Sequence, residues 1–79
     1  MSLEVENRIK SVIAEVLHVD PNDIHDASSP RSIPSWKGIN HREIVSALER
    51  EFDLSFDVGE IETFVNYKII KSTILAYID

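Results

Sequence analysis

The chain has 79 residues, of which 43% are hydrophobic and 28% charged, and its formal net charge is −6. This length supports one small core, so we expect a single domain over residues 1–79. The sequence contains no cysteine, which excludes disulfides, thiolate metal ligands and a cysteine nucleophile. Its acidity argues against nucleic acid or an anionic membrane as a partner, because both require clustered Lys and Arg.

Two further classes of protein are disfavoured by the residue pattern. No apolar run approaches the roughly 20 residues that span a bilayer, and no signal-peptide pattern opens the sequence, so we expect a cytoplasmic protein. The three histidines, His18, His25 and His41, share no metal-ligand spacing, so we predict no metal site.

Residues 3–19 carry the pattern of an amphipathic helix. Apolar side chains recur every three or four residues with charged ones between them, which places them on one helical face. We expect a first helix of about four turns. It should end before Pro21, because the residue before a proline disfavours the helical conformation.

Residues 20–36 predict a long loop. They contain all three prolines and many Asp, Asn and Ser residues, which favour turns. A short turn of helix is expected at residues 21–24. Ile24, Ile33 and Trp36 are the apolar residues able to pin this loop to the core.

A second helix is predicted over residues 39–52, where the apolar side chains again share one face. A short third helix is expected at residues 60–64. A final helix should follow Asn66, a favourable N-cap, and carry Ile70, Ile74 and Ile78 on one stripe. Strands are not predicted, because the alternating runs are short and no hairpin turn joins them.

The sequence therefore predicts an all-α fold, a small four-helix bundle with three main helices and one short helix. Four aromatic residues supply bulk for its interior, so we expect a filled core rather than a lipid pocket. These are Phe52, Phe56, Phe64 and Tyr67.

The stretch "SWKGINHREIVSALEREFDLSF" at residues 35–56, followed by "EI" and "NYKII", resembles the acyl carrier protein family across nearly the whole chain. The resemblance implies a four-helix bundle whose second helix opens with an Asp-Ser-Leu motif. It also implies that this serine carries a 4′-phosphopantetheine arm, on whose thiol acyl groups are held as thioesters.

The motif itself departs from the family. In the register of the resemblance, Lys37 falls on the Asp, Gly38 on the Ser and Ile39 on the Leu. Glycine has no hydroxyl with which to form the phosphodiester, so no cofactor is expected on this chain. Two adjacent departures favour natural loss of the carrier site. The alternative is a true acyl or aminoacyl carrier in which position 38 is naturally serine, and which then bears 4′-phosphopantetheine.

The charge of the second helix also differs from the family pattern. The resemblance implies an acidic second helix that docks on basic patches of acyl-activating, acyl-transfer or condensing enzymes, as in fatty acid or polyketide biosynthesis. Here residues 37–52 carry three basic and three acidic side chains, so their formal net charge is zero. We expect a non-catalytic module that binds a protein partner. The candidate surface, where helix and preceding loop meet, comprises Trp36, Lys37, Gly38, Ile39, His41 and Arg42.

Three residues of this region and the chain as a whole allow other interpretations. Ser35 offers the nearest hydroxyl, but a shifted register would put Trp36 in place of the motif's Leu. His41 could act as a base, yet no acid or nucleophile is paired with it in the sequence, so we do not expect an enzyme or catalytic residues. Trp36 could pack as a loop pin instead of contacting a partner. A third hypothesis for the function of the chain is a scaffold or regulatory helical domain unrelated to acyl metabolism.

Overall fold

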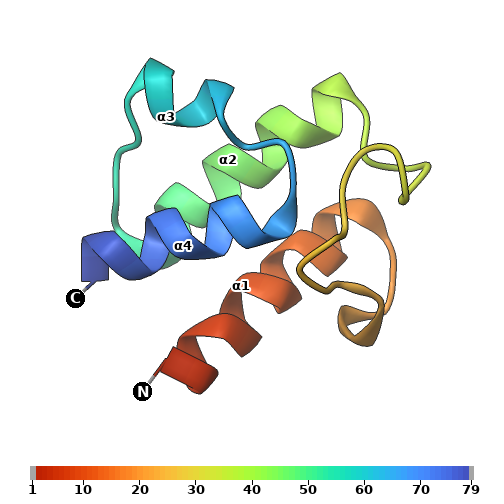
Figure 1. Ribbon diagram of the computed structural model, residues 1–79, viewed down its shortest axis with the longest axis horizontal. Helices are drawn as coiled ribbons and strands as arrows, with labels where there is room; N and C mark the ends of the chain where they lie inside the picture. Colours follow the sequence, from red (N-terminus) through yellow and green to blue (C-terminus); the bar gives the residue numbers. More distant parts are fainter. Residues whose placement is uncertain (1, 79) are drawn as a thin grey trace.

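The structure is a computed structural model that describes residues 2–78, in which helices are joined by loops (Figure 1). The elements are α1 (Ser2–Leu17), the 3-10 turn η1 (Pro21–Asp23), α2 (Gly38–Phe52), α3 (Val58–Glu62) and α4 (Tyr67–Ile78). No strand occurs within residues 2–78. The predicted all-α bundle of three main helices and one short helix is confirmed, and so is the helical turn near Pro21.

The apolar faces of the three main helices meet in one core. α1 lies against α2 and α4, and α1 begins on the side of the molecule where α4 ends (Figure 1). Removal of these side chains from water is the main stabilising contribution to the bundle. The helical core residues are Ile9, Ile13, Ala14, Leu17, Ile44, Val45, Leu48, Tyr67, Ile70 and Ile74.

Two apolar positions differ from the expected pattern. Phe52 is only partly buried at the end of α2, where the Arg8 guanidinium lies 4.5 Å from its ring centroid. Ile78 is 44% exposed, because it ends α4 beyond the last turn that faces the core. Phe56, Phe64 and Tyr67 are buried as expected, and the first two meet edge to face with centroids 5.1 Å apart.

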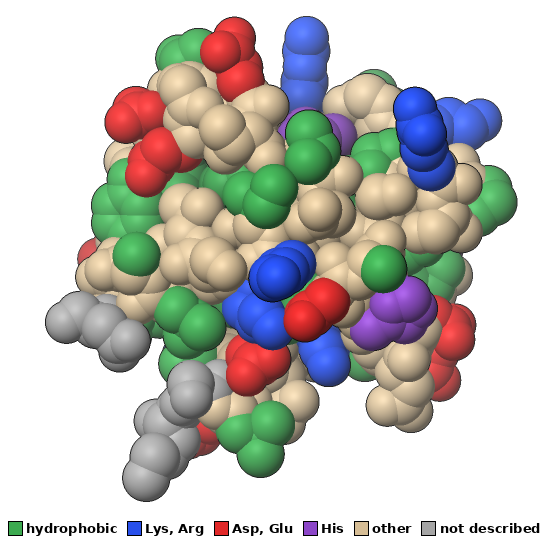
Figure 2. All heavy atoms as spheres, in the orientation of Figure 1, with side chains coloured by type: hydrophobic (Ala, Val, Ile, Leu, Met, Phe, Trp, Pro, Cys, Tyr) green, Lys and Arg blue, Asp and Glu red, His purple; other side chains and the backbone are tan. Residues whose placement is uncertain are grey.

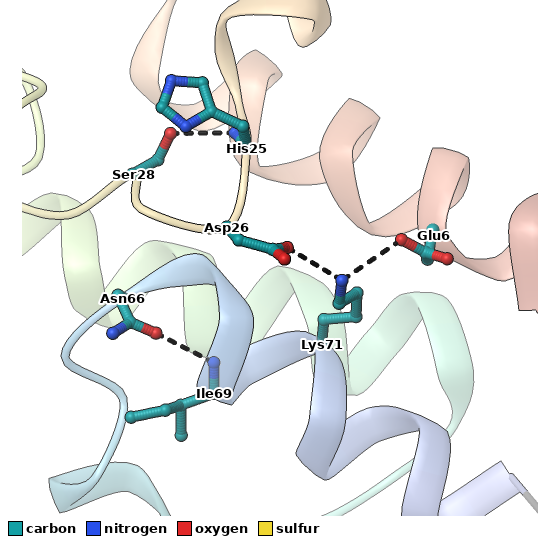
Figure 3. Close-up of polar contacts among 7 residues, drawn as sticks. All are labelled: Glu6, His25, Asp26, Ser28, Asn66, Ile69 and Lys71. Carbon is teal, nitrogen blue, oxygen red and sulfur yellow. Dashed lines mark hydrogen bonds and ion pairs between the residues drawn. The ribbon is translucent and has the colours of Figure 1, made fainter.

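The long loop between α1 and α2 is held by its own side chains. Ile24, Ile33 and Trp36 are buried, which confirms them as pins. Ser28 is a further pin that the hydrophobic pattern does not reveal. Its hydroxyl accepts the His25 N–H at 2.9 Å (Figure 3), and its carbonyl accepts the Tyr67 N–H at 2.9 Å.

An ion-pair cluster ties the same loop to two helices. The Lys71 ammonium of α4 lies 2.8 Å from the Asp26 carboxylate in the loop and 3.4 Å from the Glu6 carboxylate in α1 (Figure 3). The hydrogen bond from Lys71 lowers the pKa of Asp26, and the same bond raises the pKa of Lys71. Nearby, the Asn66 side chain accepts the Ile69 N–H at 2.9 Å, which confirms the predicted N-cap of α4.

The short helix α3 lies two residues before its predicted position at residues 60–64. Asp57 accepts the Glu60 N–H at 2.8 Å, and the Glu60 side chain accepts the Asp57 N–H at 3.1 Å. This reciprocal capping box fixes the first helical residue at Val58. Hydrophobic spacing over so short a segment does not locate the helix start, whereas the Asp-x-x-Glu pattern does.

Candidate functional site

The start of α2 is an uncapped helix N-terminus. Lys37 occupies the N-cap position with an extended backbone, φ −107° and ψ 175°, and its side chain makes no capping hydrogen bond. Gly38 is the first helical residue. A Cβ added to Gly38 meets no heavy atom within 4 Å, so the space for a side chain at position 38 is open.

Trp36 lies beneath this helix start. Its side chain is only 2% exposed, so the indole is not a protruding anchor for a partner. The indole Nε1–H donates to Nδ1 of His41 at 3.0 Å, and the two rings lie 22° from parallel with centroids 6.2 Å apart. Trp36 therefore supports the site from below and fixes the orientation of His41.

His41 is held as a neutral acceptor. Burial lowers the pKa of His41, and Nδ1 can accept the indole proton only while it is unprotonated. No carboxylate of residues 2–78 makes a hydrogen bond or ion pair with this imidazole. The imidazole thus accepts a hydrogen bond from Trp36, and it lacks the carboxylate contact that would orient it as a general base.

Ser35 is engaged elsewhere. Its hydroxyl donates to the carbonyl oxygen of Leu17 at 2.8 Å and is partly buried. This bond joins the loop to the carbonyl end of α1, where helix carbonyls have no partner within the helix. The nearest hydroxyl upstream of Gly38 therefore anchors the loop to the end of α1.

A groove of about 420 Å³ opens beside the helix start. Buried Trp36 and Phe64 form its floor, and the exposed Pro30 and Val65 form its walls. Arg31 and Lys37 bring positive charge to its rim. These six residues define what we call the α2 groove, which Gly38 and His41 also border.

The residues of the predicted surface lie in two separate depressions beside α2. Trp36, Lys37, Gly38 and His41 come together at the α2 groove. Ile39, which is 72% exposed, and Arg42 instead border a smaller depression shared with Val16 of α1. Sequence reasoning missed the Phe64 and Val65 side of the groove, because only the packing of the α3–α4 link brings residues 64 and 65 beside the start of α2.

The charge around this site is opposite in sign to that of the chain. The residues that line the α2 groove include Arg31 and Lys37 and no Asp or Glu. Both basic side chains belong to exposed residues, and within residues 2–78 neither of them forms an ion pair. Figure 2 shows basic side chains along the upper and upper-right edge, where α2 begins, and acidic side chains near α3 at the upper left.

Within residues 2–78, no three His, Asp or Glu side chains gather as candidate metal ligands. None of the described helices has the length and apolar character needed to cross a bilayer. No known protein-family model matches the sequence. The resemblance to acyl carrier proteins therefore rests on the residue pattern alone.

Proposed function

We propose that this protein is an acyl-carrier-protein-like module without the phosphopantetheine attachment serine, and that it acts as a non-catalytic protein-binding domain linked to acyl transfer or biosynthesis. One observation carries the proposal. Helix α2 begins at Gly38, the position on which the register of the resemblance places the family's serine. A residue without a hydroxyl thus stands where the arm would be attached.

The surroundings of Gly38 support a lost attachment site rather than a displaced one. The Ser35 hydroxyl is already donated to Leu17. Lys37 replaces the acidic residue of the motif, and the first turn of α2 contains no acidic side chain. The partners we propose are acyl-activating, acyl-transfer or condensing enzymes in the cytoplasm, which the module would bind without carrying their substrate.

A true acyl or aminoacyl carrier is the second candidate, and the open space at position 38 favours it. A serine side chain there would meet no neighbour within 4 Å at its Cβ, so its hydroxyl could be reached by a modifying enzyme. Under this alternative the natural residue is serine and the protein bears 4′-phosphopantetheine.

Intact-protein mass tests the proposal. The unaltered chain and the variants Gly38→Ser, Gly38→Ala and Lys37→Asp/Gly38→Ser are incubated with coenzyme A and a broad-specificity phosphopantetheinyl transferase. We expect the mass of the unaltered chain and of Gly38→Ala to stay constant, and at least the double variant to gain the arm. If the double variant, which restores the Asp and the Ser of the motif, gains nothing while folded, the relation to carrier proteins is contradicted. A gain on the unaltered chain contradicts the loss of the site.

A further inference from the structure

We propose that the α2 groove docks a segment of a partner protein in which an apolar side chain is flanked by Asp or Glu residues. The inference rests on the proposed protein-binding function and adds the chemistry of the partner. The proposed docking surface is basic and its partner acidic, whereas the family resemblance implies an acidic module with basic partners.

The interior of the α2 groove suits an apolar side chain. Its floor is made by the buried Trp36 and Phe64, and its walls by Pro30 and Val65. Val65 is 57% exposed, so a side chain that enters the groove would remove apolar surface from water on both molecules. The Trp36–His41 hydrogen bond fixes one side of the floor, which lowers the ordering cost of binding.

The rim of the groove suits carboxylates. Arg31 and Lys37 flank the groove, and within residues 2–78 neither side chain has an acidic partner. Arg presents a planar fork of donors that matches a carboxylate, whereas Lys acts as a point charge. The amide groups of the uncapped first turn of α2 add positive potential on the same side.

The charge of the whole molecule favours one orientation of an acidic partner. Since the chain carries −6 and the residues that line the groove carry +2, the remaining residues carry −8. An acidic segment is therefore attracted at this groove and repelled by the rest of the surface, which gives specificity as well as a faster encounter. A long polyanion such as duplex DNA, or an anionic bilayer, would extend beyond the groove and meet the acidic remainder.

The test is an amide NMR titration of the isotope-labelled full chain. The probe is the capped peptide Asp-Glu-Leu-Phe-Asp-Glu. Control peptides replace either its four acidic residues by Lys or its two apolar residues by Gly. We expect shifts at residues 29–38 and 64–65 with the probe, and binding at least about tenfold weaker for both controls. Binding of the probe should also weaken at about 1 M salt, where the Debye length falls to about 3 Å.

Two variants with the same change in net charge locate the effect. Arg31→Glu/Lys37→Glu should weaken binding of the probe by at least about tenfold. Arg50→Glu/Lys68→Glu places the same charges away from the groove and should bind the probe nearly as the unaltered chain does. If the first variant does not fold, Arg31→Gln/Lys37→Gln replaces it, with Arg50→Gln/Lys68→Gln as its control.

Several results would overturn the inference. In one, the probe causes no chemical-shift changes at the groove; in another, the Lys peptide binds as tightly as the probe. In a third, both charge variants lose the same amount of affinity for the probe; in a fourth, anionic vesicles or duplex DNA shift the groove residues while the probe does not.

The proposed function can fail separately. If the unaltered chain takes up the phosphopantetheine arm, the serine-less role is wrong whatever the peptide does. If its mass is constant and the probe does not bind, only the partner chemistry is wrong.

Discussion

At position 38 a glycine occupies a place where nothing in the packing requires one. Gly38 has no positive φ, and a Cβ there would meet no atom within 4 Å. Glycine loses more backbone entropy on folding than other residues, so its presence in the first turn of α2 costs stability. Folding therefore does not account for the glycine, and under the proposed function the loss of the motif's serine is also a small loss of stability.

The Gly38→Ala variant tests this account of the backbone. We expect it to raise the free energy of unfolding by about 0.4–1 kcal/mol, because it restricts the unfolded chain without creating a clash. The measurement is urea unfolding at equilibrium. Gly59→Ala is the matched control, since a Cβ there would lie 3.3 Å from Oδ1 of Asp57, the oxygen that caps α3. A smaller gain, or a loss, is expected for Gly59→Ala; equal gains would contradict this account.

The Trp36–His41 pair predicts a pH-dependent change at the floor of the α2 groove. Protonation of Nδ1 removes the acceptor for the indole N–H, and burial lowers the pKa of His41 in the folded state. The unfolded chain therefore binds the proton more readily. The stability contribution should be complete above the usual histidine pKa of about 6.5 and fall as the pH drops through the lower, folded pKa.

Trp36 fluorescence follows this titration directly, because Trp36 is the single tryptophan of the chain. We expect a change with a midpoint below about 6.5 in the folded protein. His41→Asn should abolish the change, whereas His25→Asn, a substitution at an exposed histidine, should leave it intact. A midpoint that shifts equally in both variants would assign the signal to another group.

Among the helices, α2 begins without a side-chain cap, so a substitution at its N-cap can stabilise it. Lys37 has the extended backbone of an N-cap but provides no oxygen to the first-turn amides. Lys37→Asp should raise the free energy of unfolding by about 1 kcal/mol through a cap and a favourable interaction with the helix dipole. Lys37→Asn tests the cap without a negative charge, and Lys37→Gln removes the positive charge without a cap. Thermal unfolding that ranks Gln level with Asp would contradict the capping account.

The helices of this fold could be predicted because each main helix has an unbroken apolar stripe. Ile44, Val45 and Leu48 are separated by helical intervals and are all buried. The predicted end of α2 at Phe52 is confirmed, and Asp53 follows it in the left-handed region at φ 54°. The position of α3 could not be predicted from hydrophobic spacing, because its start depends on the capping box of Asp57 and Glu60.

The candidate site could be predicted only in part. Its α2 side follows from the motif register at residues 36–38, which are neighbours in the chain. Its other side depends on Phe64 and Val65, and the ion pairs that hold the loop depend on Lys71 reaching Asp26 and Glu6. These contacts join residues far apart in the sequence, so they follow from the packing of α4 and not from any local pattern.

At the scale of the whole molecule, the core is filled by side chains from every main helix and from the loop. Trp36, Tyr67 and Leu48 are each at most 2% exposed. We expect a long-chain fatty acid to leave the melting temperature unchanged at all concentrations below its micelle formation, because the core offers no ready space for it. A concentration-dependent rise in melting temperature would show that the bundle opens to bind a lipid.

Under the proposed function, the whole chain is a carrier-like module without an attachment point. The most direct test is the intact mass of the unaltered protein after incubation with coenzyme A and a phosphopantetheinyl transferase, with Gly38→Ser in a parallel reaction. We expect no added arm on the unaltered chain under conditions that modify a known carrier protein. An added arm, mapped by fragment masses to Ser35 or to any other hydroxyl, would contradict the proposed function and would show that the protein carries acyl groups itself.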